Sequence, residues 1–134
     1  MKKLLITIVL ALFAVAGLSA QNVMKFKTTD FAYKFVNDYG YWTDWSDWED
    51  CKVLIVVNFE KETIDIYSET TQEFDIYDFE EETIEDENGE SMKMYCIDED
   101  GVKCEVRIRV QSDGQEQLYV EYANIAYVYC MEER

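Results

Sequence analysis

The chain has 134 residues, with 29 acidic and 12 basic side chains and a formal net charge of −17. This length suits one domain with a substantial core, and a hydrophobic content of 49% excludes a disordered chain. The negative charge would repel nucleic acid and anionic membrane surfaces, so neither is an expected partner. The sequence contains no histidine, which excludes Ser-His-Asp and Cys-His catalytic groups and imidazole metal sites.

Residues 1–20 have the layout of a cleavable secretory signal. Two lysines precede an apolar run at residues 4–15, and small residues follow up to Ala20. The apolar run is too short to span a membrane comfortably. We therefore expect residues 1–20 to be removed on export. Residues 21–134 would then form a single periplasmic or extracellular domain without a membrane span.

The rest of the chain alternates between apolar and polar residues, which predicts about eight β-strands and no amphipathic helix. The clearest strand covers residues 102–110, where Val102, Cys104 and Val106 alternate with charged side chains. The predicted strands cover residues 26–36, 51–59, 63–68, 72–79, 91–98, 102–110, 116–122 and 125–130.

A tryptophan segment precedes the second predicted strand, with Trp42, Trp45 and Trp48 spaced three residues apart. This spacing cannot stay on one face of a regular strand, so a turn, a bulge or a short 3₁₀ segment is expected. The rings could plug one end of the fold, because buried aromatic side chains dominate small cores. Alternatively, they could form an aromatic platform for a sugar, a lipid or a protein.

Residues 62–92 contain thirteen acidic side chains and no lysine or arginine. One interpretation is a solvated face that keeps the protein soluble. The other is a surface that binds divalent cations or a cationic protein. The residues that we would assign to a protein partner are Glu80, Glu81, Glu82, Glu85, Asp86 and Glu87.

Three turns at residues 87–89, 99–101 and 112–114 end in glycine, as in three-residue hairpin loops with a left-handed last residue. These loops set the strand registers, and apolar residues then meet apolar residues on one face. The predicted facing pairs are Ile84 with Met92, Cys96 with Cys104, Met94 with Val106, Met92 with Ile108, Ile108 with Leu118, and Val106 with Val120.

These hairpins predict an all-β fold, an antiparallel meander of about eight strands. Such a meander must hide its edges, and the economical solution is a closed or nearly closed small barrel of the lipocalin or calycin type. A barrel of eight strands would have room inside for side chains or one small ligand. A two-sheet sandwich is the alternative.

Four cysteines in an exported chain suggest disulfide bonds. The favoured bridge joins Cys96 and Cys104, provided that they form a non-hydrogen-bonded pair. Cys51 and Cys130 pair only by elimination. A simple meander places these two at opposite rims, so they could also stay free.

No motif for catalysis, metal binding or cofactor binding is present. The glycine turns lack the spacing of a calcium loop, and the cysteines lack that of a zinc site. A carboxylate pair could perform acid–base chemistry, but among 29 acids such a pair has no specificity. We therefore expect no enzymatic activity, no cofactor and no metal.

Several segments resemble known families. Gly40-Tyr41-Trp42 matches the Gly-x-Trp element of lipocalins. The whole mature chain is similar to small exported proteins of Bacteroidota, which implies a periplasmic or extracellular β-barrel of calycin type and brings no catalytic residues. The segments that carry this similarity are residues 19–21, 42–48, 53–59, 64–68, 95–101 and 117–122.

The leading functional hypothesis is a secreted, non-enzymatic barrel that binds a small apolar or amphipathic ligand in its interior or mouth. Its candidate contacts are Trp42, Trp45, Trp48, Met92, Met94, Val106 and Val120. The alternative is an acidic interaction protein that binds a cationic protein, as periplasmic lysozyme inhibitors of similar size do. A third hypothesis is a structural component of a surface assembly.

Overall fold

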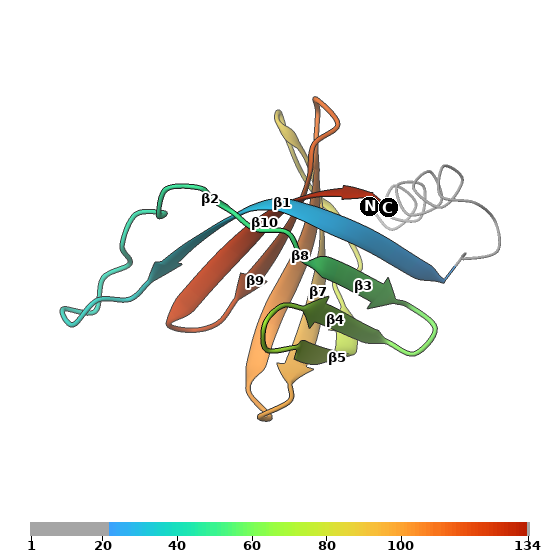
Figure 1. Cartoon of the computed structure of the whole chain (residues 1–134), viewed down its shortest axis with the longest axis horizontal. Helices are drawn as coiled ribbons and strands as arrows, with labels where there is room; N and C mark the ends of the chain where they lie inside the picture. The colour runs from blue at the N-terminus through green and yellow to red at the C-terminus, as the bar shows by residue number, and fades with distance from the viewer. Residues whose placement is uncertain (1–21, 134) are drawn as a thin grey trace.

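The computed structural model describes residues 22–133, which form an antiparallel β-structure (Figure 1). The secretory signal expected at residues 1–20 lies outside the described residues. The strands are β1 (Val23–Phe35), β2 (Glu49–Asp50), β3 (Leu54–Asn58), β4 (Thr63–Tyr67), β5 (Gln72–Phe79), β6 (Ile84–Asp86), β7 (Gly89–Asp98), β8 (Lys103–Gln111), β9 (Glu116–Glu121) and β10 (Ile125–Glu133). No helix in this described part is long and apolar enough to cross a membrane.

Eight of these strands close into a barrel. Their order is β10, β9, β8, β7, β5, β4, β3 and β1, and β1 then pairs with β10 to complete the ring. The two short strands lie outside this ring, because β2 pairs with β1 and β6 pairs with β7. The all-β meander and its closure are confirmed, and the sandwich alternative is wrong.

The registers around β8 also agree with the sequence. The structure pairs Cys96 with Cys104, Met94 with Val106, Met92 with Ile108, Ile108 with Leu118, and Val106 with Val120. Two of the glycine turns are left-handed, with φ of +81° at Gly101 and +91° at Gly114. Each places glycine where a side chain would be strained.

The third turn differs from its predicted form. Asp86 pairs with Gly89 and Ile84 pairs with Ser91, so the loop has one residue fewer than expected and Ile84 does not face Met92. A shift of one residue turns a side chain to the other face of the sheet, and Ile84 is accordingly 43% exposed. Gly89 is needed here for a close approach, because a Cβ atom would lie 2.4 Å from the carbonyl oxygen of Val110.

The barrel interior is filled by apolar side chains from every strand of the ring. Phe26, Phe74 and Met94 are at most 1% exposed, and the inward residues of β8 and β9 pack against them. Burial of this continuous cluster is the main stabilising contribution to the fold.

Strand direction defines the two ends of the barrel. One end, which we call the mouth, is where four strands end, namely β1, β4, β7 and β9. The other four strands of the ring begin there, namely β3, β5, β8 and β10. The opposite end, which we call the far end, carries the β6 hairpin and the start of β9.

We expect Gly89→Ala to lower the free energy of unfolding by about 2 kcal/mol, because the added methyl group overlaps the backbone of β8. Gly101→Ala is the matched control, since its Cβ would meet nothing within 4 Å and only the left-handed backbone is penalised. It should lose about 1 kcal/mol. Urea unfolding measures both, and equal losses would contradict the steric explanation.

Candidate functional site

Tyrosines, rather than tryptophans, close the mouth of the barrel. The hydroxyl of Tyr127 donates a hydrogen bond to Oε1 of Gln72 at 2.5 Å. Tyr127 is on β10 and Gln72 on β5, four strands away around a ring of eight, so this bond crosses the mouth. Tyr129, two residues further along β10, is 3% exposed, and burial raises its pKa to about 12. These groups cover the core from the mouth side.

An apolar strip continues from this closure along the inner face of β1 and β10. The register pairs Phe31 with Tyr129, Tyr33 with Tyr127, and Phe35 with Ile125. The Phe31 ring centroid lies 5.2 Å from that of Tyr129 and 6.0 Å from those of Tyr33 and Tyr127. We call Phe31, Tyr33, Phe35, Ile125 and Tyr127 the aromatic strip.

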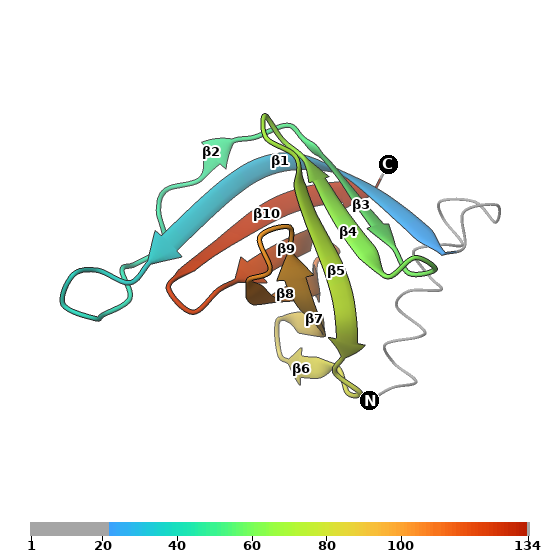
Figure 2. The same ribbon diagram turned by 90° about the horizontal axis from the view of Figure 1, so that it is seen from below.

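Exposure rises along the aromatic strip with distance from the core. Tyr129 is 3% exposed, whereas Tyr33 and Phe35 are 38% and 44% exposed and Ile125 is 39% exposed. Figure 2 shows the reason, since β1 and β10 run side by side past the ends of the other barrel strands. The outer half of the strip is thus an apolar surface that faces solvent and is carried by two paired strands.

The tryptophan segment does not plug the barrel. Its backbone lies along the free edge of β1, where Thr43 N–H donates to the Phe35 carbonyl at 2.8 Å and Ser46 N–H to the Tyr33 carbonyl at 2.7 Å. This pairing holds the rings outside the barrel, where Trp42, Trp45 and Trp48 are 45%, 40% and 51% exposed. The expected irregular backbone is present, since residues 43–48 form no strand.

Two of these indole rings belong to a layered contact on the outer face. The Lys34 ammonium lies 4.8 Å from the Trp45 ring centroid and 5.2 Å from that of Trp42. Trp45 meets Tyr119 edge to face at 6.1 Å, and the Arg107 guanidinium carbon lies 4.3 Å from the Tyr119 ring centroid. Cation–π contacts of this kind stabilise the attachment of the segment to the barrel.

The four core residues proposed as ligand contacts are packed. Met92 is 6% exposed, and Met94, Val106 and Val120 are fully buried in the core cluster. Four hollows in the described part of the chain open outward, and their linings include none of these four side chains. One of these four, about 420 Å³, is lined by residues that include Tyr77, Tyr95, Lys103 and Tyr122.

The acidic residues proposed for a cationic partner fall into two groups. Glu85, Asp86 and Glu87 line a hollow of about 340 Å³ at the far end. Glu80 accepts a hydrogen bond from the Tyr95 hydroxyl at 2.6 Å. Glu81 and Glu82 are exposed in the loop between β5 and β6.

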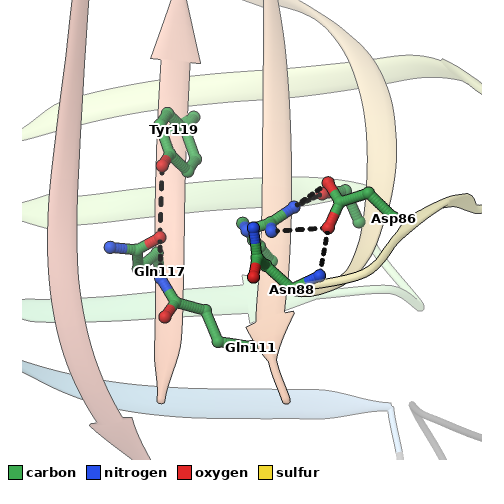
Figure 3. A network of polar contacts seen from close by, with 7 residues as sticks. Asp86, Asn88, Gln111, Gln117 and Tyr119 are labelled. Carbon is green, nitrogen blue, oxygen red and sulfur yellow. Dashed lines mark hydrogen bonds and ion pairs between the residues drawn. The ribbon is translucent and has the colours of Figure 1, made fainter. Parts of the chain in front are cut away.

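Asp86 is already paired within the protein. It accepts hydrogen bonds from Arg109, with the shortest contact at 3.0 Å, and from the backbone N–H of Asn88 (Figure 3). The Arg109 guanidinium, followed by that backbone bond, lowers the pKa of Asp86. Beside it, Gln117 accepts hydrogen bonds from Gln111 at 2.9 Å and from Tyr119 at 3.1 Å, which ties β8 to β9. Asp86 thus holds the β6 hairpin on the barrel.

The predicted disulfide between Cys96 and Cys104 is absent, although the two residues face each other as expected. Asp98 N–H donates to the Val102 carbonyl at 2.9 Å, so Asp98 and Val102 form a hydrogen-bonded pair. Hydrogen-bonded pairs recur every two residues along antiparallel strands, so Cys96 and Cys104 also form a hydrogen-bonded pair. The predicted bridge required the other class. Burial raises the pKa of Cys96 to about 12 and that of Cys104 to about 11, so both thiols stay protonated.

The expected location of Cys51 and Cys130 is also wrong. They do not lie at opposite rims but flank the same stretch of β1, since Cys130 pairs with Asp30 and Cys51 N–H donates to the Thr29 carbonyl at 3.1 Å. One strand separates them, which implies a distance of about 10 Å. A disulfide cannot span that distance, and both thiols are free.

The far end holds inward-facing carboxylates that sequence analysis did not single out. Glu116 alternates with the core residues of β9, and one of its oxygens is buried without a hydrogen-bond partner. Burial, followed by the charge of Glu133, raises the pKa of Glu116 to about 7. Glu90 on β7 also has a buried oxygen without a partner. Residues 22–133 contain no group of three or more acidic or cysteine side chains that could hold a metal ion.

The stability of the protein should depend on Glu116 in a pH-dependent way. The folded state binds this proton more tightly than the unfolded state, so stability is lost as pH rises from about 4.5 to about 7. We expect Glu116→Gln to be more stable than the natural protein at pH 8 by about 1–3 kcal/mol, with little difference at pH 4. The exposed Glu132→Gln is the control in urea unfolding, and an equal gain there would contradict this assignment.

Comparisons with known proteins do not identify a family. No family model matches the chain, and no curated protein matches it. A solved structure with some similarity is the crystal structure of HpuA from Kingella denitrificans in complex with human haemoglobin. The TM-score is 0.37 and the identity 11%, over 84% of this chain and 43% of that chain. The chain thus spans less than half of that protein, and a likeness this weak carries no argument about function. The resemblance to exported Bacteroidota proteins stays a prediction.

Proposed function

We propose that this protein is an exported, non-enzymatic binding protein that holds an apolar or amphipathic ligand on the aromatic strip, outside the barrel interior. The observation that carries the proposal is the partial exposure of Tyr33, Phe35 and Ile125 on one continuous face. Single exposed apolar residues are common, but a contiguous apolar surface is typical of binding sites.

The geometry of the mouth supports this position for the ligand. The hydrogen bond between Tyr127 and Gln72 crosses the mouth, and the side chains beneath it are fully packed. A ligand would therefore meet the strip before it met the core. Because the strip lies on paired strands rather than on a loop, its aromatic rings are held in place before binding.

A non-enzymatic role is part of the same proposal. Burial keeps the Cys96 and Cys104 thiols protonated, which makes them poor nucleophiles. The pKa values of Tyr122, Tyr127 and Tyr129 are also raised by burial, so these hydroxyls act as hydrogen-bond donors. The side chains around the strip thus suit binding better than reaction.

Nile red, a neutral apolar dye, can test the location of the site. We expect its fluorescence to increase on binding, and Tyr33→Ser/Phe35→Ser to weaken binding at least about tenfold. Tyr39→Ser/Tyr41→Ser is the control, because these residues are 85% and 72% exposed in the loop beyond β1, outside the strip. Circular dichroism checks that both variants fold. Equal losses of dye binding in the two variants would contradict the proposal.

The acidic surface supports a second candidate function, the binding of a cationic protein. The specific observation is a hollow of about 360 Å³ lined by Lys61 and four carboxylates, those of Asp65, Glu73, Asp75 and Glu99. Burial and the charge of Asp75 raise the pKa of Asp65, which indicates negative charge that is not fully balanced. Such a surface attracts cationic partners at long range.

Lysozyme serves as a basic probe protein for this second candidate. Binding through this hollow should fall at least about tenfold in Asp65→Asn/Glu73→Gln/Asp75→Asn and weaken as salt is added. The control variant, Glu60→Gln/Asp113→Asn/Glu132→Gln, removes the same number of negative charges from exposed residues elsewhere on the surface. Calorimetric titration that gave the same affinity for both variants would exclude this region as the contact.

A further inference from the structure

We propose that the ligand of the aromatic strip is a basic segment of another protein, which places apolar side chains on the strip and lysine or arginine side chains against carboxylates of the adjoining mouth loop. This inference rests on the proposed function and names its partner class. It follows from three features of the mouth: an acidic loop beside the strip, lysines that are occupied elsewhere, and aromatic rings that already receive cations within this protein.

The acidic loop is the β7–β8 turn, with Asp98, Glu99 and Asp100. Oε2 of Glu99 accepts the backbone N–H of Glu73 at 2.9 Å, so the turn lies against the start of β5, next to Gln72. Asp98 accepts a hydrogen bond from the Tyr122 hydroxyl at 2.8 Å. These contacts place the carboxylates at the same end as the Tyr127–Gln72 bond, where the aromatic strip begins.

The charges of the turn also act on Tyr127, at the base of the strip. Burial is the largest cause of its raised pKa, and the charges of Glu99 and Asp98 contribute further. Negative charge of the turn thus reaches the base of the strip. Asp98 is held by Tyr122 and by two backbone N–H groups of its own turn. Glu99, which uses one oxygen for the Glu73 N–H, and Asp100 are both exposed. The side chains of Glu99 and Asp100 are therefore the ones we assign to an incoming cation.

Lys34 and Lys103 do not neutralise this turn, and Lys61, which lines one hollow with Glu99, faces three further carboxylates there. Lys34 Nζ lies over Trp42 and Trp45 on the outer face of β1. Lys103, although close to the turn in sequence, has its Nζ 5.7 Å from the Tyr77 ring centroid. A cationic group from a partner would therefore meet unbalanced negative charge, which speeds association and favours basic partners.

The size of the strip fits an extended chain segment. From Phe31 to Phe35 the strand advances about 14 Å, the length of about four extended residues. Alternate side chains of such a segment would face the strip. Aromatic faces also attract ammonium and guanidinium groups. The outer stack of this protein provides an internal precedent, with Lys34 4.8 Å from the Trp45 centroid and Arg107 4.3 Å from that of Tyr119.

Labelled peptides test the inference by fluorescence anisotropy. The probe peptide alternates phenylalanine and lysine with serine spacers, and its analogues replace every lysine by glutamine or every phenylalanine by serine. We expect the parent peptide to bind at least about tenfold more tightly than either analogue at low salt. Equal binding of the glutamine analogue would overturn the inference.

Protein variants locate the cation contact. Glu99→Gln/Asp100→Asn should reduce the preference for the lysine peptide over its glutamine analogue by about tenfold. The matched control, Asp113→Asn/Glu132→Gln, removes the same charge from exposed residues at the far end and should keep the preference. A reduction of similar size in both variants would mean that net charge alone attracts the peptide, which overturns the inference.

The outcomes separate this inference from the proposed function. If Nile red depends on Tyr33 and Phe35 but the peptides do not distinguish lysine from glutamine, the strip binds apolar ligands and only the inference fails. If neither probe depends on these two residues, both proposals fail. The strip could instead be covered by a second copy of this chain, which sedimentation velocity tests. A dimer that disappears in Tyr33→Ser/Phe35→Ser would show this and overturn the inference.

Discussion

The pairing of β1 with β10 is the constraint on which the structure depends. It closes the ring of strands from Phe26 opposite Glu133 to Phe35 opposite Ile125, so it removes the free edges that an open meander would expose. The same pairing continues beyond the mouth, where β1 no longer borders β3. One element therefore closes the barrel and carries the apolar surface that we assign to binding.

Apolar packing stabilises the interior of the barrel, and polar contacts close its mouth. The small barrel uses its interior for stability, because side chains from every strand of the ring fill it. At the boundary with solvent, Tyr127 donates a hydrogen bond to Gln72, and the buried ring of Tyr129 packs in the core cluster. What remains for recognition is the surface beyond this boundary, where aromatic rings and carboxylates meet.

Much of the fold could be predicted from sequence, because the alternation of apolar and polar residues and the glycine turns are patterns of neighbouring residues. The pairs around Val106 followed from loop lengths alone, whereas the Ile84 pair failed because the β6 hairpin uses one residue fewer. The sequence did show Phe31, Tyr33 and Phe35 alternating in the first strand. Their partners on β10 are almost a hundred residues away, and no local pattern reveals that pairing. The tryptophans were misplaced for the same reason, since their position depends on the free edge that β1 offers beyond β3.

The claim that the ligand lies on the strip and not in the interior can be tested most directly by nuclear magnetic resonance. Nile red would be titrated into protein with labelled methionine methyl groups and backbone amides. The account predicts shifts at the amides of Tyr33, Phe35 and Ile125, while the methyl signals of Met92 and Met94 stay in place. The largest shifts at those two methyl groups would contradict it, because they would show that the core opens to admit the ligand.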